Sequence, residues 1–202
     1  MIYNYMNMKK YFLLVVLFVM SQPLFAQSAY HYDRDTVVCA NGERYTISDN
    51  AYKFKVVKDG YTLYNQETVD FQGNVILPGA YYGAGVVIDS FWQAFTETFT
   101  EEEIAVMRDA EEPTIIRIYI TKDHNGKALE VVLSIWKTAG VVVIAPHKWA
   151  QYEQNLKKYV QWHEVTEDEK NMPFSHHSYR IGKRDLVRRF AVLPDVEPIN
   201  PM

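Results

Sequence analysis

The chain has 202 residues, a formal net charge of −4 and one cysteine. Its length fits a single domain, because domains cluster at roughly 100–200 residues. The mildly acidic balance argues against nucleic-acid binding, which needs a strongly basic face, and a lone cysteine excludes an internal disulfide.

The first segment has the three parts of a cleavable secretion signal. Lys9 and Lys10 form a positive region, the apolar run Tyr11–Met20 follows, and Ala26 provides a small residue at the cleavage site. The apolar run is about half the roughly 20 residues that a helix needs to cross a bilayer. We therefore expect residues 1–26 to be removed and the product to be exported to the periplasm or the medium, with no transmembrane segment after cleavage.

The mature protein is then expected to begin at Gln27 and to be soluble. A lipoprotein needs a cysteine directly after the signal, whereas Cys39 lies well downstream. Cys39 ends the strand-like run Thr36–Cys39, where a buried, small apolar side chain is the expected role for it. An intermolecular disulfide is the alternative, and no sequence context around Cys39 favours a catalytic thiolate.

Three predicted hairpins share one pattern, in which two strand-like runs flank a turn that contains Asn-Gly or Asp-Gly. These residues tolerate the positive φ that tight turns require. The runs are Thr36–Cys39 with Arg44–Ile47, Tyr52–Val57 with Tyr61–Tyr64, and Thr114–Thr121 with Ala128–Ile135. In the third hairpin Ile116, Ile118 and Ile120 alternate with polar residues, which predicts an antiparallel sheet with one covered face.

Helices are expected to provide that cover. The apolar spacing over Val87–Phe99 predicts one helix, and Thr100 with Glu103 forms a capping box that opens a second. Pro146 suits the first turn of a third helix, which runs to about Val160. Further strands are predicted at Val160–Val165 and Phe174–Ile181, and Asp185–Phe190 fits a short helix or a strand.

Together these elements predict an α+β fold: an antiparallel β-sheet built from hairpins, with helices packed on one face. We expect residues 27–202 to form a single domain. An alternative division places a β-rich part at 27–80 and an α+β part at 86–190, joined by the glycine-rich stretch Gly79–Gly85.

The segment from Ile115 to about Phe174 carries a resemblance. Its residues Ile-Arg-Ile-Tyr-Ile-Thr-Lys-Asp, a glycine turn, Leu-Glu-Val-Val-Leu-Ser-Ile and a helix that opens at Pro146 resemble the tails of uncharacterised exported proteins from gut-type Gram-negative anaerobes. Those tails are similar in turn to the C-terminal domain of TonB. The resemblance implies a small periplasmic interaction module and supplies no functional residues. Because the chain lacks TonB's uncleaved anchor and proline-rich spacer, energy transduction is not implied.

No motif predicts catalysis, a metal site or a cofactor. His163-Glu164 lacks the second histidine of a zinc protease motif, and neither Ser90 nor Ser134 has the glycine pattern of a nucleophile elbow. The stretch Gly79–Gly85 lacks the fingerprints of nucleotide-binding loops. A metal site from His163, His176 and Glu167 is a minor alternative. A paired-carboxylate glycosidase is another, since such carboxylates come from distant sequence positions.

Two groups of residues are candidates for binding. The first consists of aromatic side chains expected to be exposed, Tyr81, Tyr82 and Trp136. Flat rings give a large contact area at low entropic cost and so favour protein or sugar partners. The second is a basic cluster in an acidic protein, which favours an acidic partner: Arg180, Lys183, Arg184, Arg188 and Arg189.

The leading hypothesis is an exported, non-catalytic module that binds another envelope protein. A binder of glycans or other small ligands through exposed aromatics is the first alternative, and an unrecognised hydrolase is the second. An exposed strand edge or apolar surface would favour the first hypothesis. An aromatic-walled groove would favour ligand binding, and a cleft with convergent polar groups would favour the hydrolase.

Overall fold

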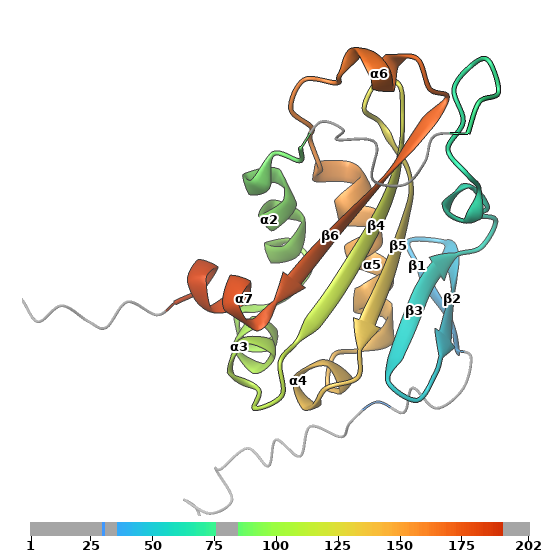
Figure 1. Ribbon diagram of the computed structural model, residues 1–202. Coiled ribbons are helices and arrows are strands. Elements are labelled where there is room, and N and C mark those ends of the chain that lie inside the picture. The colour runs from blue at the N-terminus through green and yellow to red at the C-terminus, as the bar shows by residue number, and fades with distance from the viewer. Residues whose placement is uncertain (1–29, 31–35, 76–84, 192–202) are drawn as a thin grey trace, which may run out of the picture.

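The computed structural model describes Tyr30 and residues 36–75 and 85–191 (Figure 1). The predicted signal peptide, Tyr81, Tyr82 and the proline-rich end lie outside these residues. The strands are β1 Thr36–Ala40, β2 Glu43–Asp49, β3 Lys53–Lys58, β4 Ile115–Asp123, β5 Ala128–Trp136 and β6 Phe174–Gly182. The helices are α2 Ile88–Thr96, α3 Glu101–Asp109, α4 Ala139–Val142, α5 Pro146–Tyr159, α6 Glu167–Lys170 and α7 Lys183–Arg189, with a 3-10 turn, η1, at Leu63–Asn65.

Within the described residues the strands form one sheet in the order β1-β2-β3-β5-β4-β6, and every pair is antiparallel. The predicted α+β class is therefore confirmed. The first hairpin turns at Asn41 and Gly42, both with positive φ, and the β4–β5 hairpin turns at Gly126 with φ of +82°. Positive φ values are what the Asn-Gly dipeptide in each of these two turns predicts.

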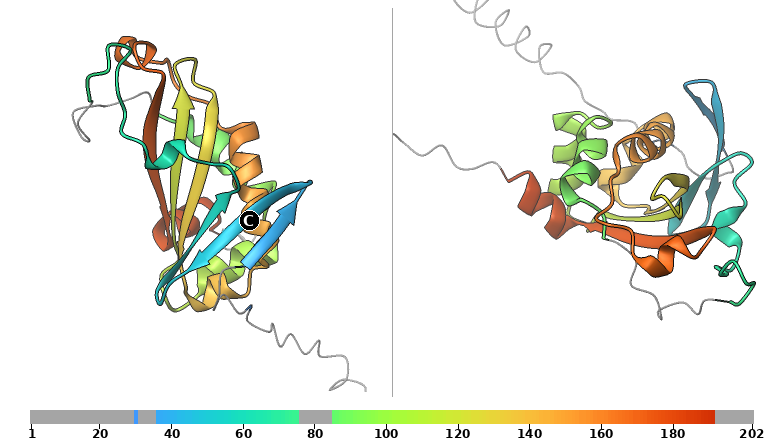
Figure 2. Two further views of the ribbon diagram at one scale, coloured as in Figure 1. Left: turned by 90° about the vertical axis from the view of Figure 1, so that its right-hand side faces the viewer. Right: turned by 90° about the horizontal axis from the view of Figure 1, so that it is seen from above.

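The two faces of the sheet differ as the alternation predicts. Ile118 pairs with Leu133, and both are fully buried under the helices. Helix α5 lies along this covered face and contacts β1, β3 and β5, with α2 beside it (Figures 1 and 2). The aromatic part of the core joins helix to sheet, because the ring of Trp149 lies 6.0 Å from that of Phe54 and 5.0 Å from that of Phe99.

The predicted helices are present with small changes at their ends. Thr100 and Glu103 form the expected capping box at the start of α3, with Thr100 Oγ1 accepting the Glu103 N–H at 3.2 Å. Pro146 occupies the first turn of α5. Of the segment Asp185–Phe190, for which a short helix or a strand is predicted, residues 185–189 belong to α7 and Phe190 follows as its C-cap.

Two predicted strands are wrong. Residues 61–64 do not pair with β3 and instead enter η1, because the Glu130 carboxylate accepts the N–H groups of Thr62 and Leu63 at 2.8 and 3.1 Å and caps the turn. Residues 160–165 make one isolated bridge, between Val86 and Trp162, and then lead into α6. In both places tertiary hydrogen bonds outweigh a local preference for extended backbone.

The expected burial of Cys39 is also wrong, since its side chain is exposed. β1 is an edge strand, and the half-buried Val38 and Ala40 are the β1 residues that pack against the core. Cys39 alternates with them and so lies on the other face of the strand, away from the core. In the described part of the chain no helix has both the length and the apolarity that spanning a bilayer requires.

Candidate functional site

The outer edge of β6 borders a groove of about 390 Å³ between α2 and α7. β6 ends the sheet, and both helices lie beside it (Figure 1). Three residues from each element line the groove: Ile88, Phe91 and Trp92 from α2, Tyr179, Arg180 and Ile181 from β6, and Asp185, Arg188 and Arg189 from α7. We call this the edge groove. An edge strand presents backbone N–H and C=O groups that a further strand can pair with.

Helix α2 forms the apolar wall of the edge groove. The Phe91 ring packs 5.8 Å from the Tyr179 ring, which ties α2 to β6. Ile88 is 58% exposed although it lies on the same helix, so the wall presents an aliphatic side chain to the solvent. Burial raises the pKa of Tyr179 to about 12, which keeps its hydroxyl neutral at physiological pH.

Helix α7 forms the charged wall. It is held by Leu186, which is fully buried, and by hydrogen bonds from Lys183 Nζ to the Ala110 carbonyl at 2.6 Å and from Arg108 Nη1 to the Phe190 carbonyl at 2.7 Å. Anchored in this way, α7 turns the exposed side chains of Arg188 and Arg189 toward the groove.

The structure divides the predicted basic cluster. Arg180, Arg188 and Arg189 line the edge groove, whereas Arg184 is exposed on α7 outside its lining and Lys183 is bound to the Ala110 carbonyl. Arg189 forms an ion pair at 3.1 Å with Asp89 of α2, and both side chains are largely exposed. A pair of this kind contributes little stability and is easily replaced by a ligand carboxylate.

Trp136, the described member of the predicted aromatic group, ends β5 with 42% of its surface exposed. It pairs with Lys53 of β3 and so lies on the sheet face opposite α5. It is therefore separate from the edge groove. Tyr81 and Tyr82 lie outside the described residues, and their role as ligand contacts stays a prediction.

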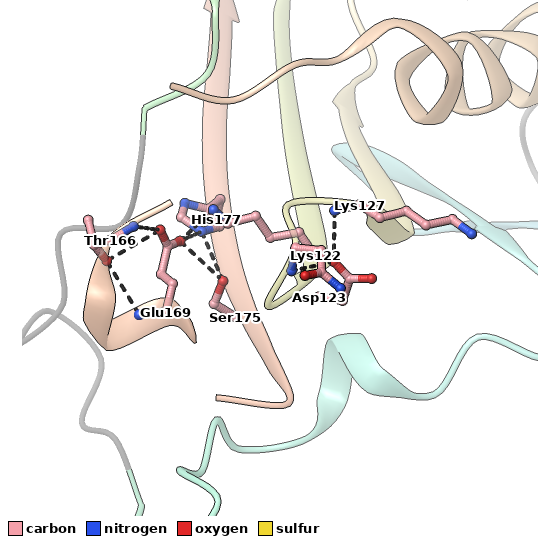
Figure 3. Close-up of polar contacts among 8 residues, drawn as sticks. Lys122, Asp123, Lys127, Thr166, Glu169, Ser175 and His177 are labelled. Atoms are coloured by element: carbon pink, nitrogen blue, oxygen red, sulfur yellow. Dashed lines mark hydrogen bonds and ion pairs between the residues drawn. The ribbon is translucent and has the colours of Figure 1, made fainter. Parts of the chain in front are cut away.

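A buried ionic network lies at the other end of β4 and β6 (Figure 3). Glu169 Oε1 lies 2.5 Å from Lys122 Nζ and 3.1 Å from His177 Nε2, and Ser175 Oγ lies 3.2 Å from the same His177 nitrogen. Lys122 and Glu169 are 0% and 1% exposed. The Lys122 ammonium also lies 4.4 Å from the centroid of the Trp162 ring, a favourable cation–π distance.

The geometry of this network does not fit nucleophilic catalysis. A relay from a carboxylate through histidine to serine uses both ring nitrogens, one for each partner. Here Glu169 and Ser175 both approach Nε2 of His177. The network instead joins α6 to the sheet, because Glu169 of α6 contacts Lys122 of β4 and His177 of β6 (Figure 3). Glu169 also accepts the Thr166 N–H at 3.1 Å, which caps the start of α6.

The electrostatics of the network follow from its burial. Burial, together with the charge of Lys122, lowers the pKa of His177 from 6.5 to about 4. His177 is therefore neutral at physiological pH. Its Nε2 carries the proton, because the neighbouring Glu169 carboxylate can only accept.

A second buried carboxylate, Glu153, faces β2 from helix α5. It accepts hydrogen bonds from the hydroxyls of Tyr45, at 2.7 Å, and Tyr61. Burial raises the pKa of Glu153, and the two tyrosine hydrogen bonds oppose that rise. The spacing of Glu153 and Lys157 predicts an i,i+4 ion pair on the exposed side of the helix, and this is wrong, because Glu153 is fully buried. Sequence reasoning did not single out Lys122 or Glu169, because a strand or helix pattern does not show which charged residues face inward.

The histidines considered for a metal site are dispersed. His163 and Glu167 are exposed, and His176 points to the open face of the sheet, where its Nδ1 lies 3.0 Å from Thr121 Oγ1. Among the described residues no three His, Cys, Asp or Glu side chains come together in a group that could hold a metal ion.

Comparison with known proteins adds information on the fold. No protein-family model and no curated protein matches the sequence. The structure is similar to the crystal structure of a DUF5043 family protein from Bacteroides uniformis, with a TM-score of 0.60 and 15% sequence identity over 76% of this chain and 94% of that chain. At this identity the similarity extends to the fold alone.

Proposed function

We propose that the protein is an exported, non-catalytic interaction module that binds an acidic, extended segment of a partner protein along β6. The observation that carries the proposal is the position of an edge strand as the floor of a groove with an apolar wall and an arginine-bearing wall. A segment that adds to a sheet edge gains main-chain hydrogen bonds, and its alternate side chains enter the flanking pockets.

The side chains of the edge groove select the partner's chemistry. Arg180, Arg188 and Arg189 favour carboxylates, which they can bind through paired N–H groups. Ile88 and Phe91 favour an aliphatic side chain at the positions between those carboxylates. The partner segment is therefore expected to alternate acidic and β-branched residues.

Export is part of the same proposal. Its support is the signal pattern of residues 1–26, and N-terminal sequencing of protein recovered from the envelope fraction should begin at Gln27. The likeness of residues 115–174 to the TonB C-terminal domain also remains a hypothesis. It is supported by the order of hairpin β4–β5, helix α5 and strand β6.

The test uses fluorescein-labelled peptides of about ten residues, one alternating valine with glutamate and one alternating valine with lysine. Fluorescence anisotropy should show binding of the glutamate peptide alone, weakened by added salt. The double variant Arg188→Glu/Arg189→Glu should lose at least about tenfold in affinity. The control is Arg184→Glu, which reverses one charge on α7 outside the groove where the double variant reverses two, and it should bind as the wild type does.

Hydrogen exchange supplies a second readout. Strand addition protects the outward-facing amides of β6, so exchange over residues 178–181 should slow when the glutamate peptide is bound. Equal binding of both peptides, equal loss in Arg184→Glu, or unchanged exchange along β6 would each overturn the proposal.

A further inference from the structure

A second groove, of about 460 Å³, lies on the sheet face opposite α5. Its floor is made by β4, β5 and β6, which contribute Tyr119, Ser134 and Ser178. Lys53 and Lys55 of β3 and Tyr64 and Asn65 at η1 complete the lining. We call this the open-face groove. Figure 2 shows η1 on the side of the sheet away from α5, and η1 contacts β4 and β5.

The η1 side of the groove is fixed by hydrogen bonds to a buried carboxylate and to a histidine. The Glu130 carboxylate, 6% exposed, accepts the N–H groups of Thr62, Leu63 and Tyr64 at 2.8, 3.1 and 2.9 Å. His176 Nε2 donates to the Gln66 carbonyl at 2.9 Å. The groove is therefore formed before any ligand arrives, as most small-molecule sites are.

The charge of the open-face groove is positive. Its carboxylate, Asp49, is paired with Lys137 at 2.6 Å. No ion pair holds Lys53 or Lys55 among the described residues, and Lys55 Nζ lies 4.2 Å from the centroid of the Tyr64 ring. Ser134 of β5 pairs with Arg117 of β4, and Arg117 pairs in turn with Arg180 of β6. These two arginines extend the positive surface beyond the groove.

The remaining lining combines serine hydroxyls, two asparagine amides, two histidines and two tyrosine rings with the aliphatic side chains of Ile120 and Val132. Ser134, Ser178 and Asn65 can donate and accept hydrogen bonds, which suits a ligand with several hydroxyl groups. The rings of Tyr64 and Tyr119 offer flat apolar faces beside these polar groups. The N–H groups of η1 that would suit a phosphate are already bound to Glu130, so a carboxylate held by the lysines is favoured over a phosphate.

From this juxtaposition of Lys53, Lys55, Tyr64 and the floor hydroxyls we infer that the open-face groove binds a small carboxylated saccharide of the uronic acid class. The lysines bind the carboxylate, Tyr64 covers one face of the sugar ring, and Ser134 and Ser178 contact its hydroxyls. This site is separate from the peptide-binding role of the edge groove and does not depend on it.

The experiment is a titration of the ¹⁵N-labelled protein with digalacturonate, maltose and glucose 6-phosphate, followed by two-dimensional NMR. Digalacturonate should shift the amides of Ser134 and Ser178 and saturate at millimolar concentration, which corresponds to about −4 kcal/mol. Maltose should bind more weakly, and glucose 6-phosphate should not compete.

Two variants separate the contributions of charge and ring. Lys55→Gln should weaken digalacturonate about tenfold, the value of one charge-assisted hydrogen bond, and leave maltose unchanged. Tyr64→Leu should weaken both sugars. Lys127→Gln is the matched control, because Lys127 is an exposed lysine outside the groove lining, and it should bind as the wild type does.

Three outcomes would overturn the inference. They are the absence of digalacturonate shifts at Ser134 and Ser178 up to about 10 mM, equal weakening by Lys127→Gln and Lys55→Gln, and competition by glucose 6-phosphate at equal concentration. Retention of the dispersed amide spectrum by each variant shows that it is folded, so these outcomes report on the groove. Failure of the edge-groove peptide test would leave this inference intact, because the peptides test the edge groove and the sugars test the open-face groove.

Discussion

His177 illustrates how one buried residue links pH to stability. Its side chain is 10% exposed, and its Nε2 lies 3.1 Å from the Glu169 carboxylate, which is in turn paired with the Lys122 ammonium. The folded protein keeps His177 neutral until about pH 4, whereas the unfolded chain protonates it near pH 6.5. Between these values the unfolded state holds the additional proton, so acidification through this window favours unfolding.

We expect the free energy of unfolding to fall by about 3 kcal/mol through this residue as the pH decreases across the window. His177→Gln keeps an N–H donor toward Glu169 and removes the titration. Urea unfolding at about pH 7 and about pH 4.5 should therefore show a smaller loss of stability in the variant than in the wild type. Equal losses in the two proteins would mean that other groups carry the acid sensitivity.

At the level of elements, α4 packs against α3 through a glycine. A Cβ on Gly140 would lie 2.8 Å from the Ala110 Cβ and 2.8 Å from the Val106 carbonyl oxygen. The backbone carbonyl cannot move away without disturbing α3. The close approach of the two helices therefore requires the absence of a side chain at position 140.

Gly140→Ala should destabilise the protein by about 1–3 kcal/mol, the usual cost of overpacking. This cost exceeds the gain of about 0.4–1 kcal/mol that alanine gives by restricting the unfolded chain. The matched control is Gly85→Ala, whose Cβ would meet only His163 Cδ2 at an ordinary 3.6 Å. Urea midpoints measure both variants, and a Gly140→Ala midpoint at or above that of the control would contradict the packing argument.

Elements with strong local signals were predicted well. The β4–β5 hairpin, the Thr100 capping box and the proline-led α5 each depend on neighbouring residues, which a sequence displays directly. The strand predicted at 61–64 failed because Glu130, far along the chain, caps η1 there. A contact across this separation leaves no periodic trace in either segment.

The candidate sites were predicted in part for the same reason. The predicted basic cluster is visible in the sequence because four of its five residues lie on one short helix, although only three of the five line the edge groove. Ile88, which lines the apolar side of the same groove, lies on a helix almost 100 positions earlier in the chain. The sequence also does not show that β6 is an edge strand, because this depends on the order of the strands in the sheet. The open-face groove was missed, because its lysines, tyrosines and serines come from five strands and a turn.

For the whole molecule, the question is whether residues 27–80 and 86–190 unfold together. One sheet crosses the proposed division, because β3 pairs with β5 from Lys53–Trp136 to Val56–Leu133. The core crosses it as well. Phe54 of β3 packs edge-on against Trp149 of α5, with ring centroids 6.0 Å apart. We therefore propose that the chain is a single domain.

A single domain of this size should unfold in one cooperative transition. All four tryptophans lie after residue 86, so their fluorescence reports on the second part, while far-UV circular dichroism reports on both. Phe54→Ala, in the first part, removes a fully buried ring and should cost about 3–5 kcal/mol.

Cooperativity requires that this variant shift the fluorescence and dichroism midpoints together and by the same amount. A pair of independent units would behave differently, because the variant would lower the dichroism midpoint and leave the tryptophan transition where it stands in the wild type. Coincident curves in both proteins would thus support one folding unit, and separated curves in Phe54→Ala would support the division at Gly79–Gly85.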